Sequence, residues 1–438
     1  MSKKKRDISG QAYYEAKVVD LTTIPDGCNE KYFYLYNQHV VDDNTVKAVV
    51  AGKITNYLGH PDTVLLDNGN LLTCYPEGHG RGATRIKISH DNGKTWPELV
   101  PNLPRTFKET KETPTIYKLN FVNGDQKLII ISGRPMWRGN KKEAQGFDAA
   151  VSTTKENGSC NGMEWEAHEN FFGPHSGRRG YYAPAGTFSA VVAMASLTHL
   201  KEDGEFIDKW MGIFHDHKFN VYKTYLTFLK SGDMHWTYPT RLFDMNYRDR
   251  EFAYNFCEPE VVRSPKGDEL AILVRTNSKT ICSHVSFSKD EGLTWSVPQR
   301  VSRELTGERH KAEYCPITGK LLITCRNIDW PLGEEYYADG FFSRGWVTWV
   351  GDYDDLKKGE DGHGDFLIKN AHTYLRGQTA STTMANSDTG YAGLAIDKTG
   401  MVISTSYGVF DASRKDTYVI CKRFRLQDVV AVSGIELK

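Results

Sequence analysis

The chain has 438 residues, and its 55 Lys and Arg residues balance its 55 Asp and Glu residues. A protein without net charge has no overall field that would favour nucleic acid or a charged membrane surface, and no apolar run is long enough to span a bilayer. The eight cysteines occur singly, without a Cys-x-x-Cys pair, which argues against a zinc ribbon or a redox motif.

The beginning of the chain is basic. Residues 3–6 read KKKR, and polar residues follow them in place of the apolar segment of a signal peptide. Because unpaired cysteines are typical of a reducing compartment, we expect a cytoplasmic protein.

A turn followed by an apolar strand recurs along the chain. In each copy a Gly in a polar turn precedes a short apolar run, at residues 67–72, 123–130, 203–214, 266–273, 318–323 and 398–403. Strands at such intervals, with few and short helix signals between them, predict an all-β protein of six repeated units. A large two-sheet sandwich is the alternative fold.

A more specific pattern occurs twice, each time after an alternating strand. Residues 89–96 read SHDNGKTW, and residues 288–295 read SKDEGLTW. In such a turn Asp accepts hydrogen bonds from nearby backbone, Gly supplies a left-handed residue, and Trp packs back onto the sheet. Two copies indicate a chain that is built from repeated units.

The shared pattern S-x-D-x-G-x-T-W resembles the Asp-box of the sialidase (neuraminidase) superfamily. The resemblance implies a six-bladed β-propeller of four-stranded antiparallel blades, which we expect over residues 46–438. Residues 1–45 would form an N-terminal segment able to close the last blade. In that family the Asp-box lies far from the catalytic face, so the repeat supports the fold and not a reaction.

Sialidase-like enzymes share three arginines that bind the substrate carboxylate, a nucleophilic Tyr, a Glu that acts as its base, and an acidic Asp. Residues 257–262, CEPEVV, are similar to the family's Glu segment. The resemblance therefore gives Glu258 the role of the base and Arg275, at the end of the next strand, that of one carboxylate-binding arginine. A Glu beside a phenol can accept its proton during attack, and the planar fork of Arg fits a carboxylate.

Two later segments extend the resemblance. Residues 342–349, FSRGWVTW, resemble the segment of the third arginine, here Arg344, and residues 389–394, TGYAGL, are similar to the nucleophile segment, here Tyr391. A neutral phenol suits a sugar with a carboxylate on its anomeric carbon, because it avoids the repulsion that an Asp nucleophile would meet.

The first part of the chain departs from the family pattern. Gly59 stands where the first arginine is expected, and the stretch 77–85 contains no Asp. Other polar residues occupy the same two loops, and they are candidates for the missing acid and for substrate binding: His60, Asp62, Glu77, His79 and Arg81. A His can serve as acid or base near neutral pH.

Five other polar residues lie outside these segments. Arg134 is a further substrate-binding candidate, whereas Arg309 and Arg326 flank a hairpin and are expected at the surface or a sheet edge. His215 and His217 would share one face of a strand, but no third ligand accompanies them, so we predict no metal site and no cofactor.

The sequence thus predicts a sialidase-like glycoside hydrolase that removes an acidic sugar, such as sialic acid, from an oligosaccharide or glycoconjugate. One alternative is a polysaccharide lyase or a His-dependent glycosidase that acts on uronate-containing glycans. A second is a propeller that binds glycans without catalysis, because propellers support many functions. Neither nucleic acid nor a membrane is an expected partner, and nothing in the sequence indicates an oligomeric state.

Overall fold

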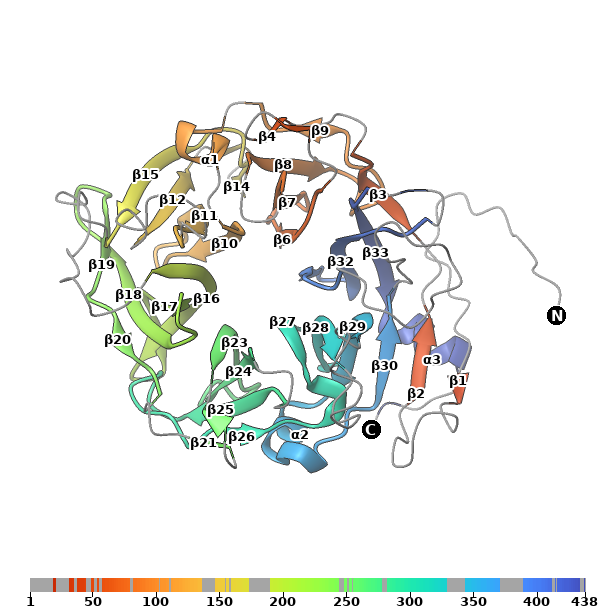
Figure 1. Ribbon diagram of the computed structural model, residues 1–438. Coiled ribbons are helices and arrows are strands. Elements are labelled where there is room, and N and C mark those ends of the chain that lie inside the picture. Colours follow the sequence, from red (N-terminus) through yellow and green to blue (C-terminus); the bar gives the residue numbers. More distant parts are fainter. Residues whose placement is uncertain are drawn as a thin grey trace.

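In the computed structural model of the protein, the described residues are 19–20, 31–34, 38–44, 49–50, 53–54, 57–78, 82–101, 103–109, 112–135, 146–153, 155–156, 159–172, 190–243, 248–249, 252–253, 255–277, 282–328, 343–370, 389–411, 414, 416–433 and 437. They form an all-β propeller of six antiparallel blades around a central axis (Figure 1). The predicted fold class is confirmed.

The first three blades follow one another along the chain. Blade one contains β6 (Asp62–Leu65), β7 (Leu71–Pro76), β8 (Thr84–Ser89) and β9 (Glu98–Leu99). Blade two contains β10 (Thr115–Asn120), β11 (Gln126–Gly133), β12 (Phe147–Ser152) and β15 (Glu166–Phe171). Blade three contains β16 (Val191–Glu202), β17 (Glu205–Asp216), β18 (Val221–Phe228) and β19 (Met234–Trp236), with β20 (Thr240–Arg241) also paired to β18.

Of the last three blades, the fifth and the sixth include strands from the N-terminal segment. Blade four contains β23 (Phe256–Arg263), β24 (Leu270–Thr276), β25 (His284–Ser288) and β26 (Gln299–Arg300). Blade five contains β27 (Gly307–Tyr314), β28 (Leu321–Ile328), β29 (Ser343–Gly351) and β30 (Phe366–Lys369), and it is extended by β2 (Lys31–Tyr34) and β1 (Val19–Asp20). Blade six contains β31 (Gly393–Ile396), β32 (Met401–Gly408), β33 (Tyr418–Arg425) and, outermost, β3 (His39–Asp42).

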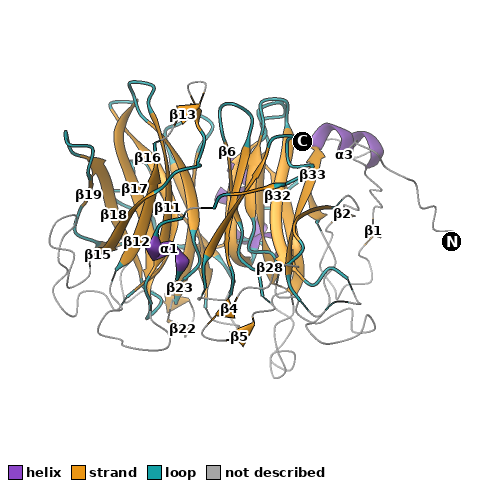
Figure 2. Cartoon of the chain, turned by 90° about the horizontal axis from the view of Figure 1, so that it is seen from above, coloured by secondary structure: helices purple, strands orange, loops and turns teal. Residues whose placement is uncertain are grey.

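Small elements decorate the ring. The short hairpins are β4 (Val49–Val50) with β5 (Lys53–Ile54), β13 (Lys155–Glu156) with β14 (Ser159–Cys160), and β21 (Arg248–Asp249) with β22 (Phe252–Ala253). The helices are α1 (Arg105–Lys108), α2 (Tyr353–Lys357) and α3 (Leu426–Ser433), with 3-10 turns η2 (Arg303–Leu305) and η4 (Gly359–Asp361). In the side view, α3 lies at one rim and the β4–β5 hairpin at the other (Figure 2). Within the described residues, no helix has the length and apolar character needed to cross a membrane.

The predicted turn–strand repeats correspond to one position in every blade. Each is the turn between the first and the second strand of a blade. Figure 1 shows these two strands nearest the axis. The apolar runs that follow these turns form the second strands, and both faces of a second strand are buried. In β7, for example, Leu71 and Tyr75 pack against blade six, and Leu72 and Cys74 against blade two. This explains why the runs are continuously apolar rather than alternating.

The core is a ring of hydrophobic clusters, one between each pair of neighbouring blades and a second, smaller one between blades five and six. No blade has a core of its own, so the free energy of burial depends on every blade having both neighbours. The cluster between blades six and one includes Val41 of β3, which pairs with β33. The ring is therefore closed by a strand from the beginning of the chain.

The two octapeptide repeats adopt one hydrogen-bonded turn. In the first, the Asp91 carboxylate accepts hydrogen bonds from Ser89 Oγ at 2.9 Å, Thr95 N at 2.8 Å and Thr95 Oγ1 at 2.7 Å, and Trp96 Nε1 donates to Gly93 O at 3.2 Å. The second copy repeats every one of these bonds at Ser288, Asp290, Thr294, Trp295 and Gly292. Both turns follow the third strand of a blade and lie at the rim opposite the start of the first strand.

Candidate active site

One rim of the propeller gathers polar side chains from all six blades. The first strand of a blade begins at this rim, and the antiparallel second strand ends there. The residues near these strand ends are His60 in blade one, Glu112 and Thr113 in blade two, His215 in blade three, Glu258 and Arg275 in blade four, Glu308, Arg309 and Arg326 in blade five, and Tyr391 and Tyr407 in blade six.

Tyr391, Glu258 and Arg275 form the centre of the site. The Tyr391 hydroxyl donates a hydrogen bond to Glu258 Oε2 at 3.0 Å and lies 2.6 Å from Arg275 Nη1. Arg275 Nη1 also forms an ion pair with Glu258 Oε2 at 2.7 Å. The three side chains, predicted from separate sequence segments, are thus in mutual contact.

Burial and charge set the protonation of this trio. Burial by itself would raise the pKa of the Glu258 carboxyl, but Arg275 and Arg309 outweigh it and bring the pKa to about 2. Burial raises the pKa of Tyr391 well above its ordinary value, Arg275 opposes this, and Glu258 adds to it. At neutral pH the site therefore holds a phenol that donates to a carboxylate.

A second carboxylate, Glu308, bridges two arginines beside Tyr391. Glu308 Oε1 lies 2.7 Å from Arg275 Nη2, and Glu308 Oε2 lies 2.7 Å from Arg326 Nη1. The guanidinium carbon of Arg326 lies 4.6 Å from the centroid of the Tyr391 ring, a cation–π arrangement. The two guanidinium groups next to Tyr391 thus face two protein carboxylates.

Arg309 and Arg326 are buried, so the surface position expected for them is wrong, although Arg309 lies in β27, the edge strand of its sheet. Their exposed fractions are 4% and 8%. Charge interactions with Asp62 and Glu258 raise the pKa of Arg309 against the opposing effect of burial. Yet no hydrogen bond or ion pair reaches the Arg309 guanidinium from the described part of the chain. Arg309 is thus a buried cation near Glu258 whose donors are available to a ligand.

The backbone explains how these side chains reach the axis. His60, Glu258 and Arg309, in the first, fourth and fifth blades, have left-handed φ values of 51°, 47° and 53°. In β23 and β27 the strand register shifts at this place, as in a β-bulge. A bulge redirects a side chain out of the regular alternation, and such strained residues cluster at functional sites. Alternation in the sequence could not have indicated the direction of Arg309.

His60 lies against the Tyr391 ring, with the ring centroids 4.8 Å apart. Thr113 Oγ1 donates to Glu112 Oε1 at 3.1 Å and therefore accepts the 2.9 Å hydrogen bond from His60 Nδ1. This chain fixes the proton on Nδ1 and leaves Nε2, 3.4 Å from the Tyr57 hydroxyl, as the nitrogen that can exchange a proton. The sequence did not indicate Glu112 and Thr113, which lie outside every recognised motif.

Asp62 belongs to a buried ionic group. This group lies in the first strands of the blades, two residues further from the rim than the residues with left-handed φ values. Asp62 Oδ2 lies 3.3 Å from Lys311 Nζ and accepts a hydrogen bond from Ile116 N at 3.1 Å. Burial raises the pKa of neighbouring Glu260 to about 7, although Lys311 opposes the rise. The carboxylate of Asp62 thus connects blades one, two and five.

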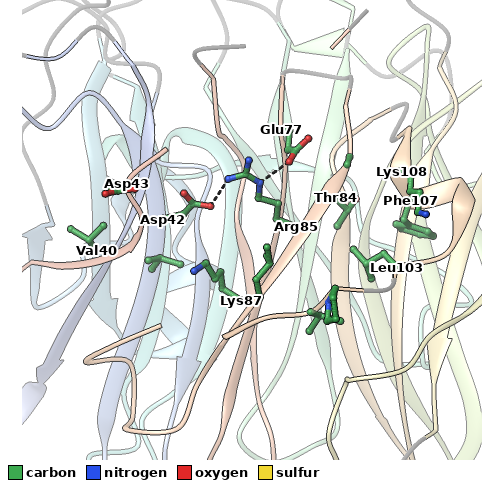
Figure 3. A pocket seen from close by; sticks show the side chains of 15 residues that line it. Val40, Asp42, Asp43, Glu77, Thr84, Arg85, Lys87, Leu103, Phe107 and Lys108 are labelled. Carbon is green, nitrogen blue, oxygen red and sulfur yellow. Dashed lines mark hydrogen bonds and ion pairs between the residues drawn. The ribbon is translucent and has the colours of Figure 1, made fainter. Parts of the chain in front are cut away.

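Glu77 lies in a different cavity. Its carboxylate pairs with Arg85 Nε at 2.7 Å, and Arg85 Nη1 pairs with Asp42 at 2.8 Å (Figure 3). This cavity of about 510 Å³ is lined by strands β3, β8 and β9, and the side chains of the Tyr391 site are not among its lining residues. In the described structure, Glu77 is therefore engaged by Arg85 in this cavity.

The remaining candidates differ in what can be said of them. Arg134, after β11, forms an ion pair with Asp148 at 3.1 Å. His79 and Arg81 lie outside the described residues, and for Arg344 only the backbone, in β29, is described.

His215 belongs to the site as a hydrogen-bond acceptor. Its Nδ1 accepts the backbone N–H of Glu258 at 3.2 Å, and burial lowers its pKa to about 4, so the ring is neutral. Within the described residues, no group of three His, Cys, Asp or Glu side chains could hold a metal ion.

The chain matches no protein-family model and no curated protein sequence. Solved structures with a similar fold include an α-L-arabinofuranosidase from Fusarium graminearum with an iminosugar inhibitor, at 13% identity, with 90% of this chain and 99% of that chain covered and a TM-score of 0.56. A protein of unknown function from Dyadobacter fermentans matches at 15% identity, 89% and 97% coverage and a TM-score of 0.55. A leech intramolecular trans-sialidase matches at 11% identity, 86% and 69% coverage and a TM-score of 0.52. These similarities show that the chain shares its propeller fold with these proteins.

Proposed function

We propose that the protein is a glycoside hydrolase in which Tyr391 is the nucleophile and Glu258 its base. The observation that carries the proposal is the position of the Tyr391 hydroxyl, which donates to Glu258 and receives a contact from Arg275. A carboxylate can take the phenol proton as the oxygen attacks, and a guanidinium stabilises the negative charge that develops on it. The glycosidase names of two structural neighbours agree with this assignment.

The proposed reaction has two steps. In the first, Tyr391 Oη bonds to the anomeric carbon, its proton passes to Glu258, and the leaving oxygen takes a proton from an acid. In the second, water attacks the same carbon and returns a proton to that acid, while the departing Tyr391 recovers its proton from Glu258. The net change is one water added across the glycosidic bond.

We assign the acid role to a histidine. His60 lies against Tyr391, and the Glu112–Thr113 chain orients its ring. His79, in the loop after β7, is the second candidate from the sequence. Comparing His60→Ala with His79→Ala separates the two, because only loss of the true acid removes activity on substrates with poor leaving groups.

Product analysis tests the proposal. The pure protein is incubated in ¹⁸O-labelled water with a panel of neutral and acidic glycosides, and the products are identified by mass spectrometry. A hydrolase releases a sugar that carries the labelled oxygen. An unsaturated product without label would identify a lyase, and unchanged glycosides that still bind would identify a binding protein.

Two substitutions tie activity to the site. Tyr391→Phe should lower kcat by about three orders of magnitude or more, because it removes the attacking atom, and Glu258→Gln by roughly 10²–10⁴-fold. Tyr314→Phe is the matched control, because the Tyr314 hydroxyl donates to Arg263 O near the opposite end of β27. If Tyr391→Phe retains activity while His79→Ala abolishes it, the proposed mechanism is wrong.

A further inference from the structure

Glu308 occupies arginines that an acidic substrate would need to bind its own carboxylate. A carboxylate on the anomeric carbon is one bond away from the atom that Tyr391 attacks, so the groups that bind it must surround Tyr391. In the described structure these groups are Arg275, in contact with the Tyr391 hydroxyl, and Arg326, stacked on its ring. Glu308 pairs with both of them at 2.7 Å.

The donors of Arg275 are already engaged. Nη1 contacts Glu258 and Tyr391, and Nη2 contacts Glu308 and, at 3.2 Å, Asn277 Oδ1. The remaining nitrogen, Nε, is buried. Neither terminal nitrogen is free to form the forked pair of hydrogen bonds that a substrate carboxylate accepts from an arginine.

Arg326 is engaged in the same way. Its Nε donates to Thr389 O at 2.5 Å, Nη1 pairs with Glu308, and Nη2 donates to the Tyr407 hydroxyl at 2.9 Å. All three nitrogens of this guanidinium thus have an acceptor within the protein.

We propose, on the basis of the glycosidase function above, that Glu308 determines specificity by filling the place of an anomeric carboxylate. The substrate is then a glycoside of an aldose, which carries hydrogen at that position, and not a ketosidic sugar acid such as a sialoside. The proposal replaces the acidic-sugar substrate expected from the sequence. That expectation rested on the arginines alone and did not include the carboxylates that pair with them.

The charges at the site support the proposal. Arg275 and Arg326 face Glu258 and Glu308, so two guanidinium groups and two carboxylates balance before any substrate enters. A third carboxylate would bring one more negative charge to the site, and the described cation left to meet it, Arg309, already interacts with Asp62 and Glu258. Burying a charge without a full partner is costly.

The test measures binding of a sugar acid to the full-length protein. The probe is 2-deoxy-2,3-dehydro-N-acetylneuraminic acid, which carries its carboxylate on the carbon that would be anomeric. Calorimetric titration compares the wild type with Glu308→Gln and with Glu308→Ala, after unfolding curves have shown that each variant is folded. Glu291→Gln is the control, because Glu291 also pairs with an arginine, Arg263, at 2.5 and 2.7 Å, outside the site.

We expect no measurable binding to the wild type or to the control. Removing the Glu308 charge should strengthen binding by on the order of tenfold or more, since it frees a charge-assisted pair. Binding to the wild type that the Glu308 substitutions do not strengthen would overturn the inference. So would a failure of every variant to bind.

A parallel activity assay separates this inference from the proposed function. The wild type is offered 4-nitrophenyl pentosides and hexosides and the 4-methylumbelliferyl ketoside of N-acetylneuraminic acid, each alongside Tyr391→Phe. Tyr391-dependent hydrolysis of aldosides alone supports both proposals. Tyr391-dependent hydrolysis of the ketoside refutes the inference and leaves the glycosidase proposal intact, whereas the absence of hydrolysis in both classes counts against the glycosidase proposal.

Discussion

Tyr391 is held between a cation and an anion, and each neighbour affects the phenol differently. Arg275 lowers the energy of a phenolate, whereas Glu258 raises it, and burial adds to the effect of Glu258. The phenol therefore stays protonated until Glu258 takes its proton during attack. Under this proposal Glu258 takes part in the reaction as the base, because a neutral amide at this position could not accept the proton.

The depressed pKa of Glu258 gives a stability test. Its folded-state pKa of about 2 lies below the ordinary value of 4.5, so its ionised form stabilises the fold above pH 4.5, and this contribution is lost as pH falls toward 2. Between pH 7 and pH 3 the loss should be about 2 kcal/mol. Urea unfolding across this range should show a shallower decline for Glu258→Gln than for the wild type. Equal slopes would contradict the assignment.

At the residue scale, the sequence indicated those candidate site residues that lie within a local motif. Glu258 and Tyr391 were found because short segments around them match a family pattern. Arg309 was not, because its direction depends on a bulge, and Arg326 was not, because it contacts Tyr391 and Tyr407 of another blade. Nor could the sequence show that Glu308 pairs with two arginines, because one of them comes from a different sheet.

Among the elements, the two octapeptide turns join neighbouring blades. Asn92 Nδ2 of the first turn donates to Asp397 Oδ2 in blade six at 2.9 Å, and Glu291 of the second accepts from Lys201 N in blade three at 2.9 Å. A Cβ on Gly292, whose φ is 80°, would lie 2.5 Å from Met211 Sδ of blade three. The shape that the two turns share thus lets each pack closely against the preceding blade.

Removing the Asp of either turn should lower stability without affecting the site. Asp91→Ala and Asp290→Ala each lose hydrogen bonds within the turn, so we expect a loss of about 1–2 kcal/mol in the free energy of unfolding, measured with urea. Activity per folded molecule should not change, because the turns lie at the opposite rim. Asp125→Ala, which removes an exposed ion pair with Lys155, should leave the free energy of unfolding nearly unchanged, because exposed ion pairs contribute little. An equal effect of all three substitutions would contradict the structural role of the turns.

The sequence predicted the repeated hairpins of the fold well, because a polar Gly turn before an apolar run is a local signal. The resemblance led us to expect residues 1–45 at the last blade, but the pairing of the individual edge strands could not be predicted. β2 pairs in parallel with β30, and β3 pairs with β33 near the other end of the chain. Such pairings depend on which edge is left open when the ring assembles, which no local pattern contains.

For the whole molecule, closure of the ring should govern stability. Val41 of β3 is 3% exposed and packs between blades six and one, whereas its neighbour Val40 is 47% exposed. Val41→Asp buries a charge at the closing seam and should cost about 3 kcal/mol or more, whereas Val40→Asp should change stability by no more than about 0.5 kcal/mol. Thermal unfolding of the two variants compares them directly. Similar unfolding temperatures would show that β3 does not close the ring.

Closure also bears on the site, because all six blades supply residues to one rim. Tyr391 from blade six meets Glu258 from blade four across the axis, and Arg326 from blade five lies against the same ring. A blade that shifted would separate these groups, so the proposed chemistry requires the complete ring.

The most direct test of the central claim is to trap the covalent intermediate. The protein is incubated with a panel of 2-deoxy-2-fluoro glycosyl fluorides of common hexoses and pentoses, digested, and mapped by mass spectrometry. Our account predicts a glycosyl adduct on the peptide that contains Tyr391, attached to its oxygen and absent from Tyr391→Phe. An adduct on Glu258, or on any other residue, would contradict the proposal that Tyr391 is the nucleophile.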